Sequence, residues 1–288
     1  MNNPENSQLT SLAKNIGIPP QPDLVIKILQ QIENDNIDIQ NIVNLVFKDV
    51  SLSAKVLKVA NSPFFRKGKV TSLLHAINLL GIKNFYTVIL VASLEEALQV
   101  NKEILKDFWS HSRLTSIICS IIAKELNIKE ETAYLTGLFH DVGVSIMLNR
   151  FDEYNKIQDY SLYLKDIKNL TDCYDTITSY ESFLFNTNHC ILAYAMAKSW
   201  KLSEDLCQVI LHHHLKPFVI KNTEIRKLMT ILQLAEILSE GFEKGDLIKD
   251  DLLLTEHFRH FAEIFSSNET FINKLISQIE SILNESSE

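Results

Sequence analysis

Apolar residues recur at intervals of three and four along most of the chain, which is the periodicity of one face of an α-helix. Short helices are expected between residues 16 and 98, and longer helices follow. We predict the longer helices at about 83–98, 103–126, 130–149, 152–165, 174–184, 188–200, 203–214, 224–242, 250–265 and 269–283. Alternating patterns joined by Asn-Gly or Asp-Gly turns, which would indicate strand pairs, are missing. The sequence therefore predicts an all-α fold.

Signals for helix ends are sparse, because the chain contains only seven glycines and six prolines. Pro22 is suited to the first turn of a helix, where a backbone N–H is not needed. Asp38 and Ser51 are predicted N-caps of the next two helices, since each side chain can accept a hydrogen bond from an unpaired backbone N–H. Ser72 is predicted to begin a further helix that stops at Gly81.

The arrangement of these helices divides the chain into three parts. Residues 1–100 are expected to form a smaller N-terminal helical subdomain, and residues 101–242 a helical core that contains most of the histidines. A polar stretch at residues 243–251 leads to a C-terminal helical pair, so the third part covers residues 243–288. Because no long flexible linker separates these parts, we predict packed subdomains.

The composition is that of a folded, acidic protein. Hydrophobic residues make up 46% of the 288 residues, which is enough to bury a substantial core. Lysine and arginine total 28 against 36 acidic residues, so the net charge is −8. This charge disfavours general binding to nucleic acid.

The cysteines and the apolar runs indicate a cytoplasmic protein. None of the four cysteines forms a CxxC pair, which fits reduced thiols packed as small apolar groups better than disulfides or a cysteine-based zinc site. The first residues, MNNPENSQLT, have neither the basic nor the apolar region of a signal peptide. No apolar run approaches the roughly 18–20 residues that span a bilayer, so no membrane association is expected.

Residues 137–143, GLFHDVG, place two ionisable side chains in an otherwise apolar helical stretch. His140 shares its helix face with Gly137 and Gly143, whose small size lets another helix approach closely. Asp141 lies about 100° further round the helix, so the two side chains can reach one cavity from different directions. Inward-facing histidines are also expected on three other helices: His111, His189, and the adjacent His213 and His214.

Two interpretations of these histidines remain open. A single buried histidine is usually a core residue that is hydrogen-bonded to a carbonyl or a hydroxyl group. Several such histidines beside a carboxylate form the ligand set that suits iron, zinc or manganese. The side chains therefore either hold metal or tie the helices together through hydrogen bonds.

Several stretches of the chain resemble known families. GLFHDVG resembles the HD motif of the HD-domain phosphohydrolase superfamily, and the order of the histidines resembles that of the HD-GYP cyclic-dinucleotide phosphodiesterases. The chain is most similar to the HDOD domain, the HD-related output domain of bacterial signalling proteins. Four stretches carry this likeness: IPPQPDLVIKIL (18–29), DVSLSAKVLKVANSPFF (49–65), AINLLGIKNF (76–85) and ESFLFNTNHCILAYAMAKSWKL (181–202), the last followed by VILHHHLKP.

The resemblance implies an HD-like helical domain, preceded by the N-terminal subdomain, that holds one or two divalent transition metals (iron, manganese or zinc). One metal position would use His111, His140 and Asp141, together with Glu236 where the family has an aspartate. The other would use Asp141 and three histidines: His189, His213 and His214. Asp141 would bridge the two positions, and it is the catalytic candidate if the site is active.

Two departures from the HD enzymes favour a non-catalytic module. Glu236 carries an extra methylene, which moves its carboxylate by about 1.5 Å relative to an aspartate. Val144 stands where many active enzymes have a lysine that contacts phosphate. The expected function is therefore a bacterial signalling module with a protein or nucleotide partner. The alternative is a metal-dependent phosphohydrolase that acts on a nucleotide or a cyclic dinucleotide.

A locally basic segment in the N-terminal half is a candidate surface for an anionic partner. Between residues 48 and 69 the sequence carries six basic residues against Asp49 alone. Five of them are the proposed contacts: Lys55, Lys58, Arg66, Lys67 and Lys69. The alternative is an ordinary solvated helix face and loop, which is the commoner situation.

Overall fold

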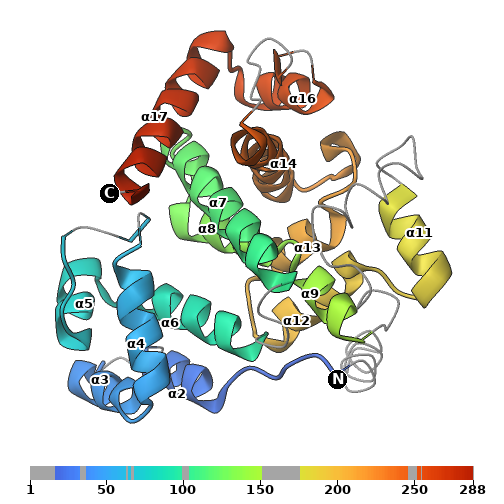
Figure 1. Cartoon of the computed structure of the whole chain (residues 1–288). Helices are drawn as coiled ribbons and strands as arrows, with labels where there is room; N and C mark the ends of the chain where they lie inside the picture. Colours follow the sequence, from blue (N-terminus) through green and yellow to red (C-terminus); the bar gives the residue numbers. More distant parts are fainter. Residues whose placement is uncertain are drawn as a thin grey trace. The chain divides into compact units, whose positions relative to one another are not determined.

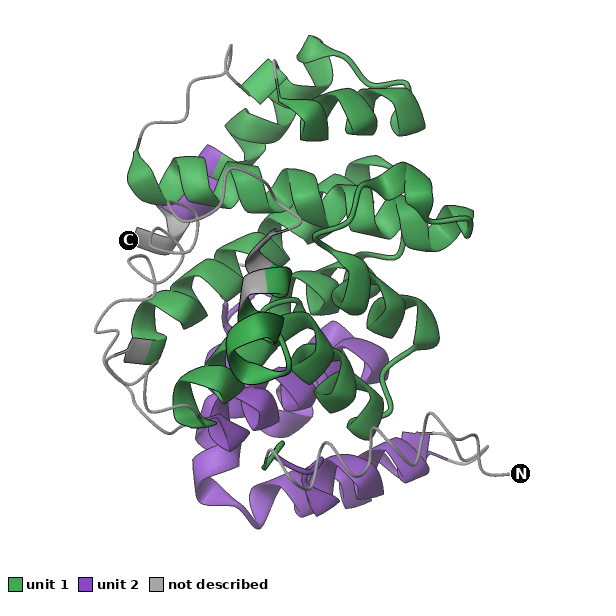
Figure 2. Ribbon diagram, turned by 90° about the vertical axis from the view of Figure 1, so that its right-hand side faces the viewer, with its two compact units in different colours: residues 1–18, 100–279 green, residues 19–99, 280–288 purple. Residues whose placement is uncertain are grey.

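The structure, a computed structural model, describes residues 17–32, 37–62, 64–65, 68–98, 104–150, 176–245, 252–253 and 255–287. Every regular element in these ranges is a helix (Figure 1), which confirms the predicted all-α fold. The residues cluster into two compact units, which are drawn in different colours in Figure 2. One unit contains residues 19–99 and 280–288, and the other contains residues 1–18 and 100–279. The predicted division at residues 1–100, 101–242 and 243–288 stays a prediction.

The unit of residues 19–99 is built around one apolar helix. Its helices are α2 (Asp23–Ile32), α3 (Ile39–Phe47), α4 (Val50–Ala60), α5 (Leu73–Leu80) and α6 (Ile82–Ala97). Helix α6 packs against α2, α4 and α5, and its side chains from Thr87 to Leu94 are all buried. The basic segment lies in this unit, along α4 and the loop that follows it.

Three of the predicted helix-end signals act as expected. The Asp38 side chain accepts a hydrogen bond from the N–H of Asn41, and that of Ser72 accepts one from the N–H of His75. Gly81 ends α5 with a φ of +79°. Glycine adopts a positive φ readily, whereas residues that carry a Cβ atom rarely do.

The predicted N-cap of the helix at residues 50–60 is wrong. Helix α4 begins at Val50, and its N-cap is Asp49, whose side chain accepts a 2.9 Å hydrogen bond from the N–H of Leu52. Ser51 therefore lies inside the first turn, where its hydroxyl has no capping role. The sequence alone could not distinguish Asp49 from Ser51 as the N-cap, because aspartate and serine are similarly favoured at that position.

The larger unit contains the histidine-rich segments. Its helices are α7 (Ile104–Glu125), α8 (Glu130–Phe139), α9 (Val142–Arg150), α11 (Thr176–Phe185), α12 (His189–Ser199), α13 (Glu204–His212), a 3₁₀ turn η2 (Pro217–Val219), α14 (Thr223–Lys244), α16 (Glu256–Phe265) and α17 (Glu269–Ser287). Helix α7 packs along α8 and α14, while α12 packs against α9 and α13. Helix α17 belongs to this unit up to residue 279.

The helix that was predicted at residues 130–149 divides into α8 and α9 at His140 and Asp141. The N–H of His140 still reaches the Thr136 carbonyl, as in an α-helix. The N–H of Val144 instead reaches the carbonyl of Asp141, three residues back, and this tighter turn starts α9. The prediction of one continuous helix is therefore wrong, and the helix breaks at His140 and Asp141, which we call the HD pair.

The two glycines of the GLFHDVG segment permit close contacts between helices. A Cβ atom on Gly137 would lie 2.7 Å from Cα of Ser116 on α7, and one on Gly143 would lie 1.9 Å from the carbonyl oxygen of His189 at the start of α12. Both positions therefore require glycine. The HD pair is held between α7 on one side and α12 on the other.

Two further expectations differ from the described structure or lie outside it. The helix predicted at residues 203–214 ends at His212, so His213 and His214 lie in the turn that follows α13. The helix predicted at residues 152–165, and Cys173, lie outside the described residues. None of the helices described here combines the length and apolarity that a membrane crossing would need.

Candidate metal centre

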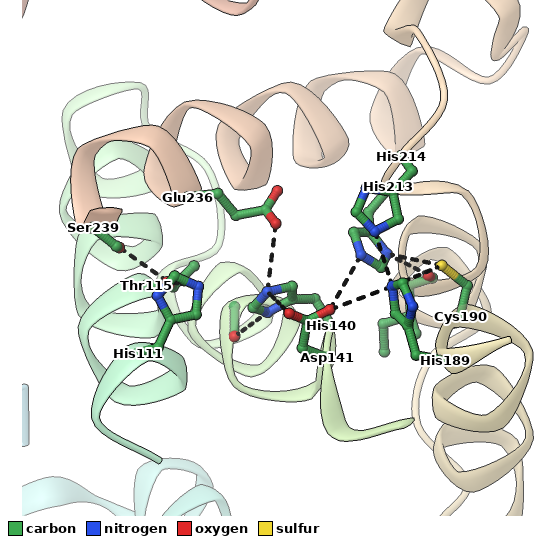
Figure 3. Close-up of polar contacts among 12 residues, drawn as sticks. His111, Thr115, His140, Asp141, His189, Cys190, His213, His214, Glu236 and Ser239 are labelled. Atoms are coloured by element: carbon green, nitrogen blue, oxygen red, sulfur yellow. Dashed lines mark hydrogen bonds and ion pairs between the residues drawn. The ribbon is translucent and has the colours of Figure 1, made fainter. Parts of the chain in front are cut away.

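The structure brings all seven predicted ligand residues together in the larger unit, as Figure 3 shows. They come from the middle of α7, the turn between α8 and α9, the first residue of α12, the turn after α13, and α14. In chain order they are His111, His140, Asp141, His189, His213, His214 and Glu236. Residues 125 positions apart in the sequence thus face one region of the core.

Asp141 lies at the centre of this group, and its two carboxylate oxygens face different histidines (Figure 3). Its Oδ2 atom is 3.3 Å from Nε2 of His140. Its Oδ1 atom is 3.4 Å from Nε2 of His213 and 3.6 Å from Nε2 of His189. The carboxylate therefore separates two clusters of possible ligands while contacting both.

Backbone carbonyl groups fix the orientation of two of the imidazole rings. Nδ1 of His140 lies 2.7 Å from the Gly137 carbonyl, and Nδ1 of His213 lies 2.7 Å from the Ile210 carbonyl. A carbonyl oxygen can only accept, so each Nδ1 donates, and each Nε2 faces the site, where it can carry a proton or bind a metal ion. Both Nε2 atoms are buried without a hydrogen-bond partner.

Two carboxylates orient the rings of His189 and His111 in the same way. His189 Nδ1 donates to Oε2 of Glu181 at 2.7 Å, and His111 Nδ1 lies 3.0 Å from Oε2 of Glu243. Metal-binding histidines commonly donate their second ring nitrogen to such a carboxylate. Sequence reasoning missed Glu181 and Glu243, because no short spacing marks a residue that reaches its histidine only through folding.

The described residues contain two groups whose ligand atoms are close enough to surround an ion. The first contains His111, His140 and Asp141. Glu236 adds a carboxylate to it, with Oε1 at 3.5 Å from Nε2 of His140. The second contains His189, Cys190, His213 and His214. The ligand atoms of His111, His140 and Asp141 lie within 4.8 Å of one another, and so do those of the second group.

Cys190 departs from the prediction that the cysteines are only small apolar residues. Its Sγ atom lies 3.3 Å from Nε2 of His189, inside the second group. The sequence did contain a feature that could have indicated this position of Cys190. Cys190 directly follows His189, just as Asp141 directly follows His140. The other described cysteines, Cys119 and Cys207, are buried free thiols, as the prediction expected.

The charges of the site depend on close pairing between acids and imidazoles. Burial opposes the ionisation of Asp141, but His140, His213 and His189 hold its pKa well below the usual value. Burial also raises the pKa of Glu236, only partly offset by nearby histidines. Protons on the imidazoles thus supply the positive charge that a buried anion needs.

The second group has the same dependence on neighbouring charges. Burial favours neutral His189, but Cys190 and Glu181 outweigh it and raise the pKa of this histidine well above its usual value. Burial raises the pKa of the Cys190 thiol, while His189 and His213 lower it to about 7. A bound cation would take the place of these protons, since metal binding and protonation compete for the same lone pairs.

The predicted anion-binding residues are only partly described. Lys55 lies 3.5 Å from Glu96, so its charge is already paired within the smaller unit. Lys58 and Lys69 are exposed, while Arg66 and Lys67 lie outside the described residues. The role of this segment as a partner surface stays a prediction.

A model of the HDOD domain matches residues 18–216, more than half of the chain. The chain belongs to the HDOD family. Glu236 lies beyond the matched residues, on α14. A relative from Treponema pallidum, an uncharacterized protein, is 26% identical over 223 residues. That similarity covers 73% of this HDOD chain but only 41% of the relative, so the chain spans less than half of the relative's length.

Solved structures share this HDOD fold. An HDOD domain protein with unknown function from Geobacter sulfurreducens has a TM-score of 0.69 at 21% identity, and the similarity covers 98% of both chains. A protein from Shewanella amazonensis, whose name suggests a phosphohydrolase, has a TM-score of 0.70 at 21% identity and covers 94% of this chain and 93% of its own. These likenesses establish the HD-like helical fold.

Proposed function

We propose that this HDOD chain is a metal-binding signalling module whose core holds one or two divalent transition metals. His111, His140, Asp141 and Glu236 would hold one ion, and the histidines of the second group, with Asp141, would hold the other. One observation carries the proposal. The buried Nε2 atoms of His140 and His213 face the Asp141 carboxylate from two sides and have no hydrogen-bond partner.

The donor set fits iron, manganese or zinc, because neutral imidazole and carboxylate are the ligands that these ions prefer. A bound ion of this kind supplies Lewis-acid chemistry and neutralises nearby negative charge. The residues of this chain supply the rest. Glu181 and Glu243 orient two rings, and backbone carbonyls orient two more.

The low exposure of His140 and Asp141, and the valine at position 144 where many active enzymes have a lysine, favour a non-catalytic role. The side chain of His140 is fully buried and that of Asp141 is 9% exposed, so the two side chains offer little accessible surface to a phosphate group. Val144 is buried where a phosphate-binding lysine would be needed. We therefore propose that the module acts in the cytoplasm through a protein or nucleotide partner, and that metal stabilises the shape which the partner recognises.

A metal-dependent phosphohydrolase is the second candidate, and Asp141 is the observation that favours it. A carboxylate that shares its two oxygens between two metal positions is suited to two-metal hydrolysis of a phosphate ester. A panel of phosphodiesters and cyclic dinucleotides separates the candidates. Steady turnover that is abolished in a folded His140→Ala variant would establish the enzyme, and absence of turnover in metal-loaded protein supports the signalling module.

Thermal denaturation with and without a chelator tests the metal-binding proposal. A ligand present at 100 times its dissociation constant stabilises a protein by about 2.7 kcal/mol, which corresponds to a Tm shift of about 5–10 °C in a domain of this size. Wild-type protein should lose this stability on chelation and regain it when metal is added. His140→Ala, which removes a ligand of the first position only, should show a smaller response. His75→Ala, which alters an exposed histidine of the other unit, should respond like wild type. An unchanged wild-type Tm would contradict the proposal.

A further inference from the structure

We propose that Cys190 is a metal ligand, so that the second group is a nitrogen–sulfur site that selects zinc over manganese. This inference rests on the proposed metal-binding function, and it concerns which residue and which ion the second position uses. The HD pattern in the sequence assigns histidines and carboxylates only. Cys190 is added because its Sγ atom lies among the nitrogen atoms of the second group.

The spacing of the donor atoms matches the spacing around a small ion. Ligands of tetrahedral zinc are separated by roughly 3.3 Å between two nitrogens and roughly 3.6 Å between nitrogen and sulfur, given the usual bond lengths. Here Sγ of Cys190 lies 3.3 Å from Nε2 of His189, and that nitrogen lies 2.9 Å from Nε2 of His214 (Figure 3). The sulfur–nitrogen distance is close to the ligand spacing, while the nitrogen–nitrogen distance is that of a hydrogen bond, which a bound ion would replace as the two rings move slightly apart.

Local structure holds Cys190 and His189 in place at the start of α12. Asn188 caps this helix by accepting a hydrogen bond from the N–H of Ile191 at 2.9 Å. The fully buried Glu181 carboxylate accepts both the N–H and the Nδ1–H of His189. With Nδ1 occupied, Nε2 of His189 points toward the thiol. Consecutive residues of one fixed turn thus supply a sulfur and a nitrogen donor.

An independent observation indicates a cation at this position. His213 is 1% exposed, and its buried Nε2 atom has no hydrogen-bond partner. The same nitrogen is 3.4 Å from Oδ1 of Asp141, and a buried pair of this kind needs a positive charge, which either a proton on the ring or a bound metal ion supplies. A metal ion would satisfy both atoms in place of the proton, and Sγ of Cys190 lies 3.7 Å from the Nδ1 atom of the same ring.

The two groups therefore differ in ligand chemistry. The first offers imidazole and carboxylate donors, which suit manganese, iron and zinc alike. The second adds a thiolate, which is a soft donor that favours zinc and disfavours manganese. Cys190 would thus make the second position more selective for zinc over manganese than the first.

Cobalt substitution tests the sulfur ligand directly. Apo protein is prepared with a chelator under anaerobic conditions and titrated with Co²⁺, which reports thiolate ligation by a near-ultraviolet charge-transfer absorption. Wild-type protein should show this band in proportion to the cobalt bound at the second position, because the first group contains no thiol. Cys190→Ser should lose it, and its affinity for the ion of the second position should fall about ten-fold or more. Cys207→Ser, which removes a buried thiol outside the group, should keep the band.

The possible results separate the two proposals. Cobalt that binds stoichiometrically to wild-type protein without a thiolate band would overturn the role of Cys190 and leave the metal-binding function intact. Failure of wild-type protein to bind cobalt would overturn both. If Cys190→Ser does not fold, the wild-type spectrum alone still decides, because the band either accompanies the bound cobalt or is missing.

Competition between metals provides a second readout. Apo protein is incubated with equal amounts of Zn²⁺ and Mn²⁺, and the bound ions are counted after free metal is removed. Wild-type protein should retain zinc at the second position, and Cys190→Ser should shift the ratio of zinc to manganese toward manganese. An unchanged ratio in a folded Cys190→Ser variant would contradict the selectivity.

Discussion

At the scale of single residues, the chemistry of the site depends on which ring nitrogen of each histidine carries the proton. The carbonyls of Gly137 and Ile210 and the carboxylates of Glu181 and Glu243 hold Nδ1 in four rings. The HD motif could predict His140 and Asp141. It could not predict Glu181, because a buried glutamate in a helix has no spacing that links it to a particular histidine.

The carboxylate of Glu181 gives a prediction at this scale. Glu181→Gln keeps the size of the side chain but removes the negative charge that strengthens His189 as a ligand. Metal affinity should fall by about 10-fold to 100-fold, as it does when such supporting carboxylates are lost elsewhere. Isothermal titration with Zn²⁺ measures the change. Glu204→Gln, which alters an exposed glutamate paired with Lys198, is the matched control. Equal affinities in both variants would show that Glu181 has no role in the site.

At the scale of helices, periodicity predicted where most elements lie, because one face of each helix must be apolar to pack. It did not predict the break at His140 and Asp141, since both residues still fit a helical pattern. The break arises from a tertiary contact. Gly143 approaches the carbonyl of His189 so closely that α9 must start in a particular position against α12.

Gly143 therefore gives a prediction for the contact between α9 and α12. The Cβ of Gly143→Ala would meet a backbone carbonyl oxygen, which cannot rotate away as a side chain can. The free energy of unfolding should fall by about 1–3 kcal/mol. Urea denaturation measures this loss, and Asn149→Ala on the exposed end of α9 should stay within about 0.5 kcal/mol of wild type. A Gly143→Ala variant as stable as wild type would mean that α9 and α12 do not touch there.

The corrected N-cap of α4 gives a second prediction at this scale. Asp49→Ala removes the hydrogen bond to the N–H of Leu52, so the protein should lose about 1 kcal/mol of stability. Ser51→Ala should change stability by less than half as much, since that hydroxyl caps nothing. Chemical denaturation of the two variants compares them directly, and a larger loss from Ser51→Ala would reverse the assignment.

At the scale of the whole molecule, the sequence predicted the helical class and the acidic charge, because both follow from composition and periodicity. It could not predict that His111 on α7 and Glu236 on α14 meet around Asp141. That meeting depends on how five segments of the larger unit pack. The resemblance to the family predicted that His111 and Glu236 belong to one site. The carbonyls and carboxylates that contact Nδ1 of the rings became visible only in the structure.

The net charge of −8 gives a prediction for the whole chain. At physiological salt, random-sequence duplex DNA should bind more weakly than about 10⁻⁴ M, the weak end of ordinary non-specific binding. Fluorescence anisotropy of a labelled duplex provides the measurement. Tight binding that weakens steeply with added salt would contradict this prediction and make the basic segment between residues 48 and 69 the first candidate surface.

The central claim is that distant side chains converge on Asp141 to hold metal, and elemental analysis tests it most directly. The protein is purified under anaerobic conditions from cells supplied with iron, manganese and zinc. Wild-type protein and His75→Ala should contain about one or two transition-metal ions per chain, and the double variant His140→Ala, Asp141→Ala should contain clearly less. Folded wild-type protein with a metal content near zero would contradict the account.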